Sequence, residues 1–221
     1  MSEILELTSG VTPAAIDRAL VCLLQGEVIV VAAEHAYMYL CDAFNPTAVE
    51  RIHQLRGDKP GTAAQVMVGN VSAVSGLAQD FDSDLQLIAE KFWPGLLTMQ
   101  LAPQSALSWN LGDERRLAEF ALRIPNREFI LALLKRSGPL AAASAALAGS
   151  APSRELNAVP AMASEIGLFV DEGLLPEGPI STVLRRTAIG GGSGIELFRE
   201  GAITLLEIQE LVPSISAVEP K

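Results

Sequence analysis

The feature that most constrains the fold of this chain is an alternation of two kinds of segment. Short apolar runs alternate with segments that carry a helix cap and apolar residues at helical spacing. The run at 28–33 (VIVVAA) follows a segment in which Thr12 can cap a helix and Pro13 suits its first turn, while apolar residues recur at helical spacing. The same succession recurs along the chain, and several apolar runs are expected to pair as hairpins. The pattern is typical of an α/β domain with a mixed sheet.

The boundaries of the expected elements follow from caps, glycines and prolines. We expect helices at 12–24, 45–55, 71–77, 82–92, 126–135 and 204–211, and strands at 28–33, 64–68, 96–101, 118–124, 140–144, 166–170, 182–185 and 195–199. The 221 residues suffice for one large domain or two small ones, with a core that needs no disulfide or metal. The last residues, SISAVEPK, are expected to be a frayed tail.

Composition limits the cellular context. Apolar residues make up 49% of the chain, yet no apolar run approaches the length of a membrane span. The N-terminus (MSEILELTSG) lacks a basic region followed by an apolar run, so no signal peptide is expected. Cys22 and Cys41 make neither a disulfide framework nor a zinc pattern, and we expect buried free thiols. These features predict a cytoplasmic protein without a membrane partner.

Charge argues against a surface that binds nucleic acid over a broad area. The formal net charge is −10, although a local basic site is compatible with that value. Twelve of the sixteen basic residues are arginines, whose guanidinium groups suit bidentate contacts with phosphate or carboxylate. Any anion site is therefore expected to be local and built from arginine.

Several familiar catalytic patterns are missing from the sequence. The glycine run GGGSG (190–194) is followed by neither Gly-Lys-Ser/Thr nor an expected helix, and a flexible loop between strands is the better interpretation. There is no Gly-x-Ser-x-Gly turn, and His35 and His53 cannot be joined to a nucleophile. His53 falls mid-helix and is expected at the surface. No metal-ligand spacing is present.

The remaining candidates for a binding site are basic and hydroxyl side chains near expected strand ends and loops. If they converge, guanidinium groups would bind phosphate or carboxylate oxygens and the hydroxyls would bind the remaining ones. Their convergence would make a concave anion site. These residues are Arg56, Lys59, Arg123, Ser144, Ser181, Thr182 and Arg199.

The order of several motifs resembles one known family. The segments CDAFNPTAVERIHQLRG, FWPGLLTMQL, ALRIPNREFILALL, GPLAAASAALAGSAPS, STVLRRT and LFREGAI are similar, in this order, to segments of the YrdC/YciO (threonylcarbamoyl-AMP synthase) family. The resemblance runs from about 12 to 211. It implies a single YrdC-like domain at 12–211, after an arm at 1–11 and before a tail at 212–221. The implied fold has a twisted mixed sheet flanked by helices around a concave groove.

The resemblance also implies an activity. Enzymes of the family use L-threonine, bicarbonate and ATP, with Mg²⁺ on the phosphates, and make threonylcarbamoyl-AMP and pyrophosphate for tRNA modification. Some members are described as binding double-stranded RNA. ATP, a small amino acid and tRNA or double-stranded RNA are therefore the expected ligands and partners. The oligomeric state is left open.

The first family motif is rebuilt in this chain. The aligned stretch is AAEHAYMYLCD (32–42), in which Glu34 and Tyr37 match the family. His35 takes the place of a threonine, and Met38 and Leu40 replace two glycines. Bulky side chains at glycine positions should fill the pocket or reshape the turn. By resemblance the substrate-binding residues are Glu34, His35, Tyr37 and Ser181.

The second motif, Lys-x-Arg-Pro in the family, reads RGDKP (56–60) here. Arg56 takes the lysine position. Without a gap Asp58 takes the arginine position, and with one inserted residue Lys59 takes it. These alternatives predict opposite charges at that point. By resemblance, Arg56 and Lys59 are the candidate catalytic residues.

The third motif, Ser-Ala-Asn in the family, retains Ser144 but has Ala146 in place of the asparagine. By resemblance the nucleotide-binding residues are Arg56, Arg123, Ser144, Ser181, Thr182 and Arg199. Three hypotheses follow. The chain is an adenylate-forming synthase with an altered pocket, a diverged paralogue that binds nucleotide or double-stranded RNA without catalysis, or a protein–protein module that keeps only the fold.

Overall fold

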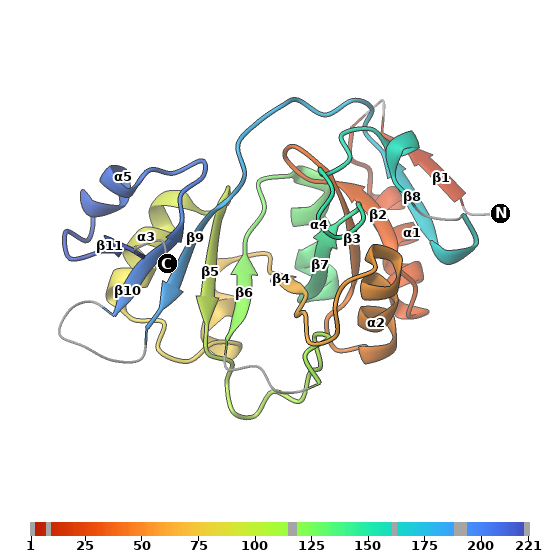
Figure 1. Ribbon diagram of the computed structural model, residues 1–221. Coiled ribbons are helices and arrows are strands. Elements are labelled where there is room, and N and C mark those ends of the chain that lie inside the picture. Colours follow the sequence, from red (N-terminus) through yellow and green to blue (C-terminus); the bar gives the residue numbers. More distant parts are fainter. Residues whose placement is uncertain (1–2, 8–9, 115–118, 161–162, 188–193, 219–221) are drawn as a thin grey trace.

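The strands form one mixed sheet (Figure 1). The computed structural model describes residues 3–7, 10–114, 119–160, 163–187 and 194–218. Their strands are ordered β1-β8-β2-β3-β7-β4-β6-β5-β9-β10-β11. The neighbours β2/β3, β5/β6 and β9/β10 pair antiparallel as hairpins, whereas β4/β6 and β5/β9 pair parallel. The predicted α/β domain with a mixed sheet is confirmed.

The strands lie close to the predicted ranges. Their bounds are β1 Glu3–Glu6, β2 Ile29–Ala32, β3 Tyr37–Asp42, β4 Gln65–Met67, β5 Leu97–Leu101, β6 Phe120–Arg123, β7 Leu140–Ser144, β8 Leu168–Asp171, β9 Thr182–Arg186, β10 Ile195–Arg199 and β11 Ser216–Ala217.

The helices begin where the sequence supplies caps. The side chains of Thr12, Asn45, Asp82 and Thr204 each accept a backbone N–H at a helix start, which satisfies a donor that has no partner within the helix. The helices are α1 Pro13–Leu24, α2 Pro46–Arg56, α3 Ser83–Phe92, α4 Glu128–Ser137 and α5 Leu205–Gln209, with 3₁₀ turns η1 Val71–Gly76, η2 Leu156–Ala158 and η3 Ala163–Glu165. None of the helices in the described ranges is long and apolar enough to cross a membrane.

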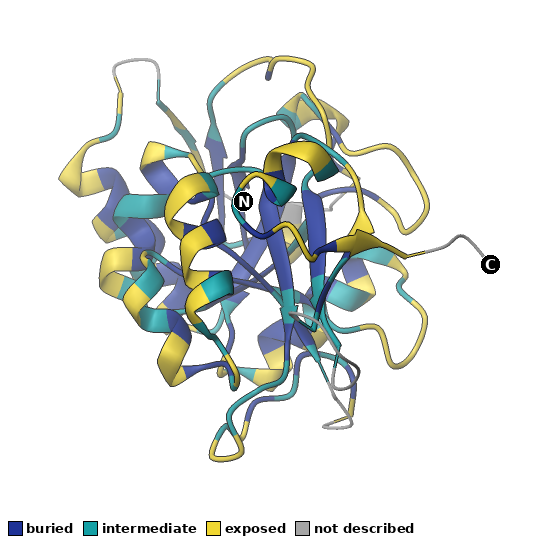
Figure 2. Cartoon of the chain, turned by 90° about the vertical axis from the view of Figure 1, so that its left-hand side faces the viewer, coloured by how far each residue is buried: buried dark blue, intermediate teal, exposed yellow. Residues whose placement is uncertain are grey.

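The helices divide between the two faces of the sheet. One apolar cluster joins α1 and α4 to the sheet through residues such as Ile16 and Phe129. The other joins α2, α3 and α5 to the opposite face, through Ile52, Ile88 and Ile208. Figure 2 shows the resulting pattern of buried strands under helices with exposed outer faces. Each such side chain contributes roughly 1.5–3 kcal/mol when it is fully buried.

Three strands differ from the expectations. β3 was not expected as a separate strand because its residues are buried on both faces, so the alternation of a half-buried strand is missing. β1, in the expected arm, pairs parallel with β8. β11 lies in the expected frayed tail and pairs with β10, while Ile215 beside it is 1% exposed. Residues 190–193 of the GGGSG run lie outside the described residues.

Candidate functional site

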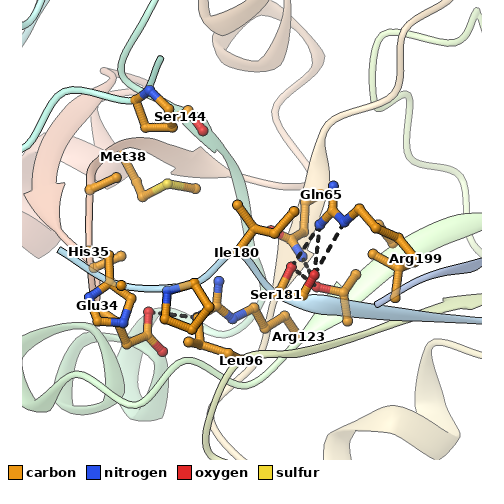
Figure 3. A pocket seen from close by; sticks show the side chains of 18 of the residues that line it. Glu34, His35, Met38, Gln65, Leu96, Arg123, Ser144, Ile180, Ser181 and Arg199 are labelled. Carbon is orange, nitrogen blue, oxygen red and sulfur yellow. Dashed lines mark hydrogen bonds and ion pairs between the residues drawn. The ribbon is translucent and has the colours of Figure 1, made fainter. Parts of the chain in front are cut away.

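A cavity of about 700 Å³ lies over the strands from β3 to β10 (Figure 3). Its floor carries side chains from β4, β5, β6 and β9, and its walls come from the loops around residues 33–36, 152–154 and 177–181. Three arginines and two glutamates line it. Six of the predicted site residues meet here: Glu34, His35, Arg123, Ser144, Ser181 and Arg199.

One side of the cavity, which we call the hydroxyl end, consists of Thr98, Ser181 and Arg199. Arg199 Nη2 donates to the Ser181 carbonyl at 2.9 Å and to its Oγ at 3.1 Å, and the Thr98 hydroxyl donates to the same Oγ at 3.1 Å. Arg199 has no carboxylate partner among the described residues. Partial burial lowers the pKa of Arg199 from its usual value. This end therefore presents a cation that no carboxylate of the described residues neutralises.

A second group, which we call the ion-pair end, consists of Glu34, His35 and Arg123. Arg123 Nη2 lies 2.6 Å from Glu34 Oε2, and its Nε donates to the Gly95 carbonyl at 3.0 Å. The other Glu34 oxygen accepts the backbone N–H of Asn126 at 2.7 Å. Both charged side chains are nearly buried, with 12% exposure for Glu34 and 8% for Arg123. The positive charge of Arg123 is therefore neutralised within the protein by Glu34.

His35 contacts the segment that runs from β8 to β9. Its Nδ1 lies 3.2 Å from the Pro176 carbonyl, which can only accept, so Nδ1 carries the hydrogen. The ring lies flat against Gly178, where an added Cβ would come within 2.2 Å of ring atoms. Arg154 holds the same segment through the Leu175 carbonyl at 2.9 Å and through Glu177 at 2.6 Å. The 172–180 segment is thus tied to the wall of the cavity.

The two bulky residues at the family's glycine positions have different fates. Met38 lines the cavity and pairs in register with Ser144. Leu40 is fully buried in the cluster beneath α1 and α4, and it is not among the described residues that line the cavity. Of these two residues, Met38 is therefore the one that lies at the cavity.

Tyr37 does not reach the cavity, contrary to its prediction as a substrate-binding residue. Its hydroxyl lies 2.9 Å from both Asp171 Oδ1 and the Gly173 carbonyl, and accepts the N–H of Glu172 at 3.0 Å. Burial raises the pKa of Tyr37 to about 12. Tyr37 therefore fixes the start of the 172–180 segment to β3.

Thr182 is also structural, contrary to its prediction as a nucleotide-binding residue. It is fully buried. Its hydroxyl donates to the Ile203 carbonyl at 2.7 Å and accepts the N–H groups of Gly201 and Ile203. All hydrogen-bonding capacity of this hydroxyl is used to hold the turn after β10.

Neither Arg56 nor Lys59 is among the described residues that line the cavity. Arg56 Nη1 donates to the carbonyls of Ser144 and Ala146, and its Nε donates to Asp58 at 3.0 Å. Lys59 lies beside a separate hollow of about 480 Å³ next to α2. Neither alignment of the RGDKP motif thus puts a side chain into the cavity. Arg56 can thus affect a ligand through the end of β7, which carries Ser144.

His53 is not the surface residue that its place in the helix predicts. Its Nδ1 lies 2.9 Å from Asp58 Oδ2, and its Nε2 lies 2.8 Å from the Leu111 carbonyl. Only 13% of the side chain is exposed. His53 therefore connects α2 to the loop before β6, outside the cavity.

Five polar cavity residues were not predicted: Gln65, Thr98, Gln100, Arg154 and Glu177. Gln65 Nε2 donates to Thr98 Oγ1 at 3.0 Å, which extends the hydroxyl end onto β4. Gln65 and Thr98 lie in strands that were predicted as apolar. A polar residue in an otherwise apolar strand was the signal that could have identified them as site residues. Arg154 and Glu177 lie in loops without a periodic pattern.

The described residues offer no built metal site, since they contain no cluster of three or more His, Cys, Asp or Glu side chains in a suitable arrangement. The two carboxylates that line the cavity are each paired with an arginine, Glu34 with Arg123 and Glu177 with Arg154. A magnesium ion would therefore fit here as a companion of ligand phosphates rather than on the protein alone.

Comparisons with known proteins identify relatives of this chain. The family model Sua5_yciO_yrdC, described as telomere recombination, matches residues 21–201. The putative threonylcarbamoyl-AMP synthase of Mycobacterium leprae is 25% identical over 203 residues, which are 91% of this chain and 90% of that protein. The threonylcarbamoyl-AMP synthase of Bacillus subtilis (strain 168) is 29% identical over 90% of this chain and 57% of its own length.

Solved structures share the fold. P. abyssi Sua5 complexed with L-threonine superposes with a TM-score of 0.87 at 24% identity, covering 98% of this chain and 63% of that one. E. coli YciO has a TM-score of 0.79 at 22% identity and covers 94% of this chain and 100% of its own. This chain thus spans less than two thirds of the P. abyssi Sua5 chain and all of YciO. It belongs to the Sua5/YciO/YrdC family.

Proposed function

We propose that this protein forms a carbamoyl-adenylate of a small amino acid, with L-threonine as the first substrate to test. In this reaction the amino group and bicarbonate condense to a carbamate with loss of water. A carbamate oxygen then attacks the α-phosphorus of ATP, and pyrophosphate leaves. Relatives named threonylcarbamoyl-AMP synthase, 25–29% identical over most of this chain, support the proposal.

The observation that carries the proposal is the hydroxyl end of the cavity. Arg199, free of any carboxylate partner among the described residues, and the Ser181 hydroxyl face a space of about 700 Å³. A space of this size accommodates a nucleotide, since ligand pockets span roughly 300–1,000 Å³. Phosphoryl and nucleotidyl transfer depend mainly on positioning and charge neutralisation, which a guanidinium and a directed hydroxyl supply. Magnesium bound to the triphosphate would neutralise further charge there.

The ion-pair end would receive the amino acid. His35 and Met38 occupy its wall, and Glu34 and Arg123 hold its floor rigid through their ion pair. His35 keeps its Nε2 as the ring nitrogen able to accept, because Nδ1 donates to the Pro176 carbonyl. An amino or hydroxyl donor is the natural partner of that nitrogen. Met38 sets an apolar limit on the side chain that fits.

A second candidate, a nucleotide-binding paralogue without synthesis, is favoured by one observation. Arg56, at the family's catalytic lysine position, is occupied by the carbonyls of Ser144 and Ala146 and by Asp58. Lys59 stands at another hollow. Among the described residues that line the cavity, Arg199 is therefore the one cation without a carboxylate partner. Binding of tRNA or double-stranded RNA belongs to this candidate and has the net charge of −10 against it.

One experiment separates the two. ATP binding is measured by calorimetry, and pyrophosphate release and adenylate formation are followed by mass spectrometry with and without L-threonine and bicarbonate. We expect pyrophosphate release that depends on both. ATP binding without any adenylate product would contradict the synthase and select the paralogue. A protein that binds neither ATP nor RNA would contradict both and support a protein–protein module.

A further inference from the structure

A chain of hydrogen bonds crosses the cavity floor and ends at Ser181. Gln65 Nε2 donates to Thr98 Oγ1 at 3.0 Å, Thr98 Oγ1 donates to Ser181 Oγ at 3.1 Å, and Arg199 Nη2 donates to Ser181 Oγ at 3.1 Å. Thr98 and Ser181 come from β5 and from the residue before β9, and Gln65 comes from β4. Figure 3 shows Gln65, Ser181 and Arg199 gathered on one side of the cavity.

Burial determines the direction of this chain. Thr98 is only 4% exposed, and among the described residues its hydroxyl hydrogen has one acceptor within reach, Ser181 Oγ. A buried hydroxyl that leaves its hydrogen unpaired loses about 1–3 kcal/mol, so Thr98 must donate to Ser181. Ser181 then accepts from Thr98 and from Arg199 together. Both of its lone pairs are engaged, and its own hydrogen remains for a ligand in the cavity.

The amide of Gln65 is compatible with only this direction of the hydrogen bonds, from Thr98 to Ser181. Because Nε2 faces Thr98, the threonine oxygen accepts from Gln65 and its hydrogen is directed to Ser181. An acceptor at the same place would take the Thr98 hydrogen. Ser181 would then donate to Thr98 and have no hydrogen left for a ligand. Ser181 thus remains a donor to the cavity as long as the side chain at position 65 offers Thr98 no acceptor, which the Nε2 group of Gln65 ensures.

We propose that Gln65 is a positioning residue, which acts through Thr98 to hold Ser181 as a hydrogen-bond donor to an anionic ligand beside Arg199. The ligand class is a phosphate-bearing molecule, and its identification as ATP rests on the proposed function. The donor arrangement itself rests only on the contacts of Gln65, Thr98, Ser181 and Arg199.

The test compares Gln65→Glu with Gln65→Leu, each in the native background and in a Thr98→Val background. Affinities for inorganic tripolyphosphate, ATP and adenosine are measured by calorimetry, and circular dichroism melts confirm folding. We expect Gln65→Glu to weaken tripolyphosphate and ATP by about tenfold, as loss of one charge-directed hydrogen bond predicts. Gln65→Leu should weaken them by no more than about threefold, because Thr98 can still donate to Ser181.

The Thr98→Val background separates the relay from simple charge repulsion. Valine cannot transmit the reversal, so Gln65→Glu should cost at most about threefold there, whereas repulsion by the new carboxylate would persist. Gln25→Glu, an exposed glutamine at the end of α1, controls for the added charge. Adenosine affinity should not change in any variant, and a Thr98→Ser background, which restores the hydroxyl, should restore the loss caused by Gln65→Glu.

Equal losses from Gln65→Glu in both backgrounds would overturn the proposal, as would equal losses for adenosine and tripolyphosphate. A native protein that binds no tripolyphosphate would overturn it as well. Failure of the synthase proposal looks different: the native protein would bind tripolyphosphate and ATP but release no pyrophosphate. The variants would then still decide whether Gln65 directs Ser181.

Discussion

The two ends of the cavity use arginine in opposite ways. At the ion-pair end, Arg123 is nearly buried against Glu34 and the Gly95 carbonyl. At the hydroxyl end, the hydrogen bonds that Arg199 makes with the described residues all go to Ser181, and its side chain lines the cavity. A buried guanidinium already paired with a carboxylate contributes to the architecture, whereas one without such a partner can bind an added anion. Residue type alone therefore does not identify a binding residue.

The largest expected effect tests the ion-pair end as architecture. Glu34→Ala should lower the free energy of unfolding by about 3 kcal/mol, because it leaves the buried Arg123 without its carboxylate. Urea denaturation measures the change. Glu177→Ala is the matched control, because the Glu177 side chain, which pairs with Arg154, is 84% exposed. This variant should lower the free energy of unfolding by less than about 0.5 kcal/mol.

The double variant Glu34→Ala/Arg123→Met refines this test. Removing both charges should recover much of the lost stability, since an apolar replacement of a buried ion pair is often close to neutral. If Glu34→Ala proves as mild as Glu177→Ala, the ion-pair end is not the rigid element inferred here.

The second effect tests the hydroxyl end as a binding surface. Arg199→Met should weaken ATP by about 30-fold, equivalent to roughly 2 kcal/mol for a charge-assisted contact, with little change in stability. Arg154→Met, which removes a cavity arginine already paired with Glu177, should weaken ATP by less than about threefold. Calorimetry gives both values. Equal losses from the two variants would remove the distinction between paired and unpaired arginines.

Much of the fold was predictable because its signals are local. The caps at Thr12, Asn45, Asp82 and Thr204 are side-chain properties, and they mark helix starts that the structure confirms. β3 was missed because its residues are buried on both faces and show no alternation. β11 was missed because two residues carry too little pattern, although they pair with β10.

The site was less predictable because it depends on which partners the end of each side chain reaches in the folded protein. Arg56, Arg123 and Arg199 look alike in the sequence, yet each has different partners in the fold. Tyr37 and Thr182 were assigned to ligands by position in a motif, whereas their hydroxyls are saturated by the protein. Long-range partners such as Asp171 for Tyr37, 134 residues away, leave no local signal.

A third effect compares two tyrosines of β3. The Tyr37 hydroxyl has hydrogen-bond partners at Asp171, Glu172 and Gly173, whereas the Tyr39 hydroxyl is buried without a partner among the described residues. Tyr37→Phe should cost about 1.5 kcal/mol, and Tyr39→Phe should be neutral or stabilising. Urea denaturation at neutral pH separates them. A larger cost for Tyr39→Phe would contradict the hydrogen-bond assignment.

The same tyrosines predict a pH dependence. Burial raises the pKa of both Tyr37 and Tyr39 from 10.0 to about 12. The folded state holds these protons more tightly than the unfolded state, so their contribution is fully present below pH 10 and is lost as the pH rises toward about 12. Denaturation at a series of alkaline pH values measures the decline. Each Tyr→Phe variant should make it shallower, and an unchanged slope would contradict the raised pKa values.

The smallest effect tests the contact between His35, at the ion-pair end, and the 172–180 segment. An alanine Cβ at residue 178 would come within 2.2 Å of the His35 ring. The ring lies at the end of a rotatable side chain, so Gly178→Ala should swing it away rather than move the segment. The cost is the His35–Pro176 hydrogen bond, worth about 1 kcal/mol.

This displacement has a spectroscopic signature. The His35 ring signals in NMR spectra should shift toward those of an exposed histidine in Gly178→Ala. The stability losses of Gly178→Ala and His35→Ala should not add in the double variant, because both remove the same contact. Gly76→Ala, whose Cβ meets nothing within 4 Å, is the control and should leave the His35 signals unchanged. Additive losses would mean that Gly178 is required by the backbone of the segment and that His35 does not hold the segment against the cavity wall.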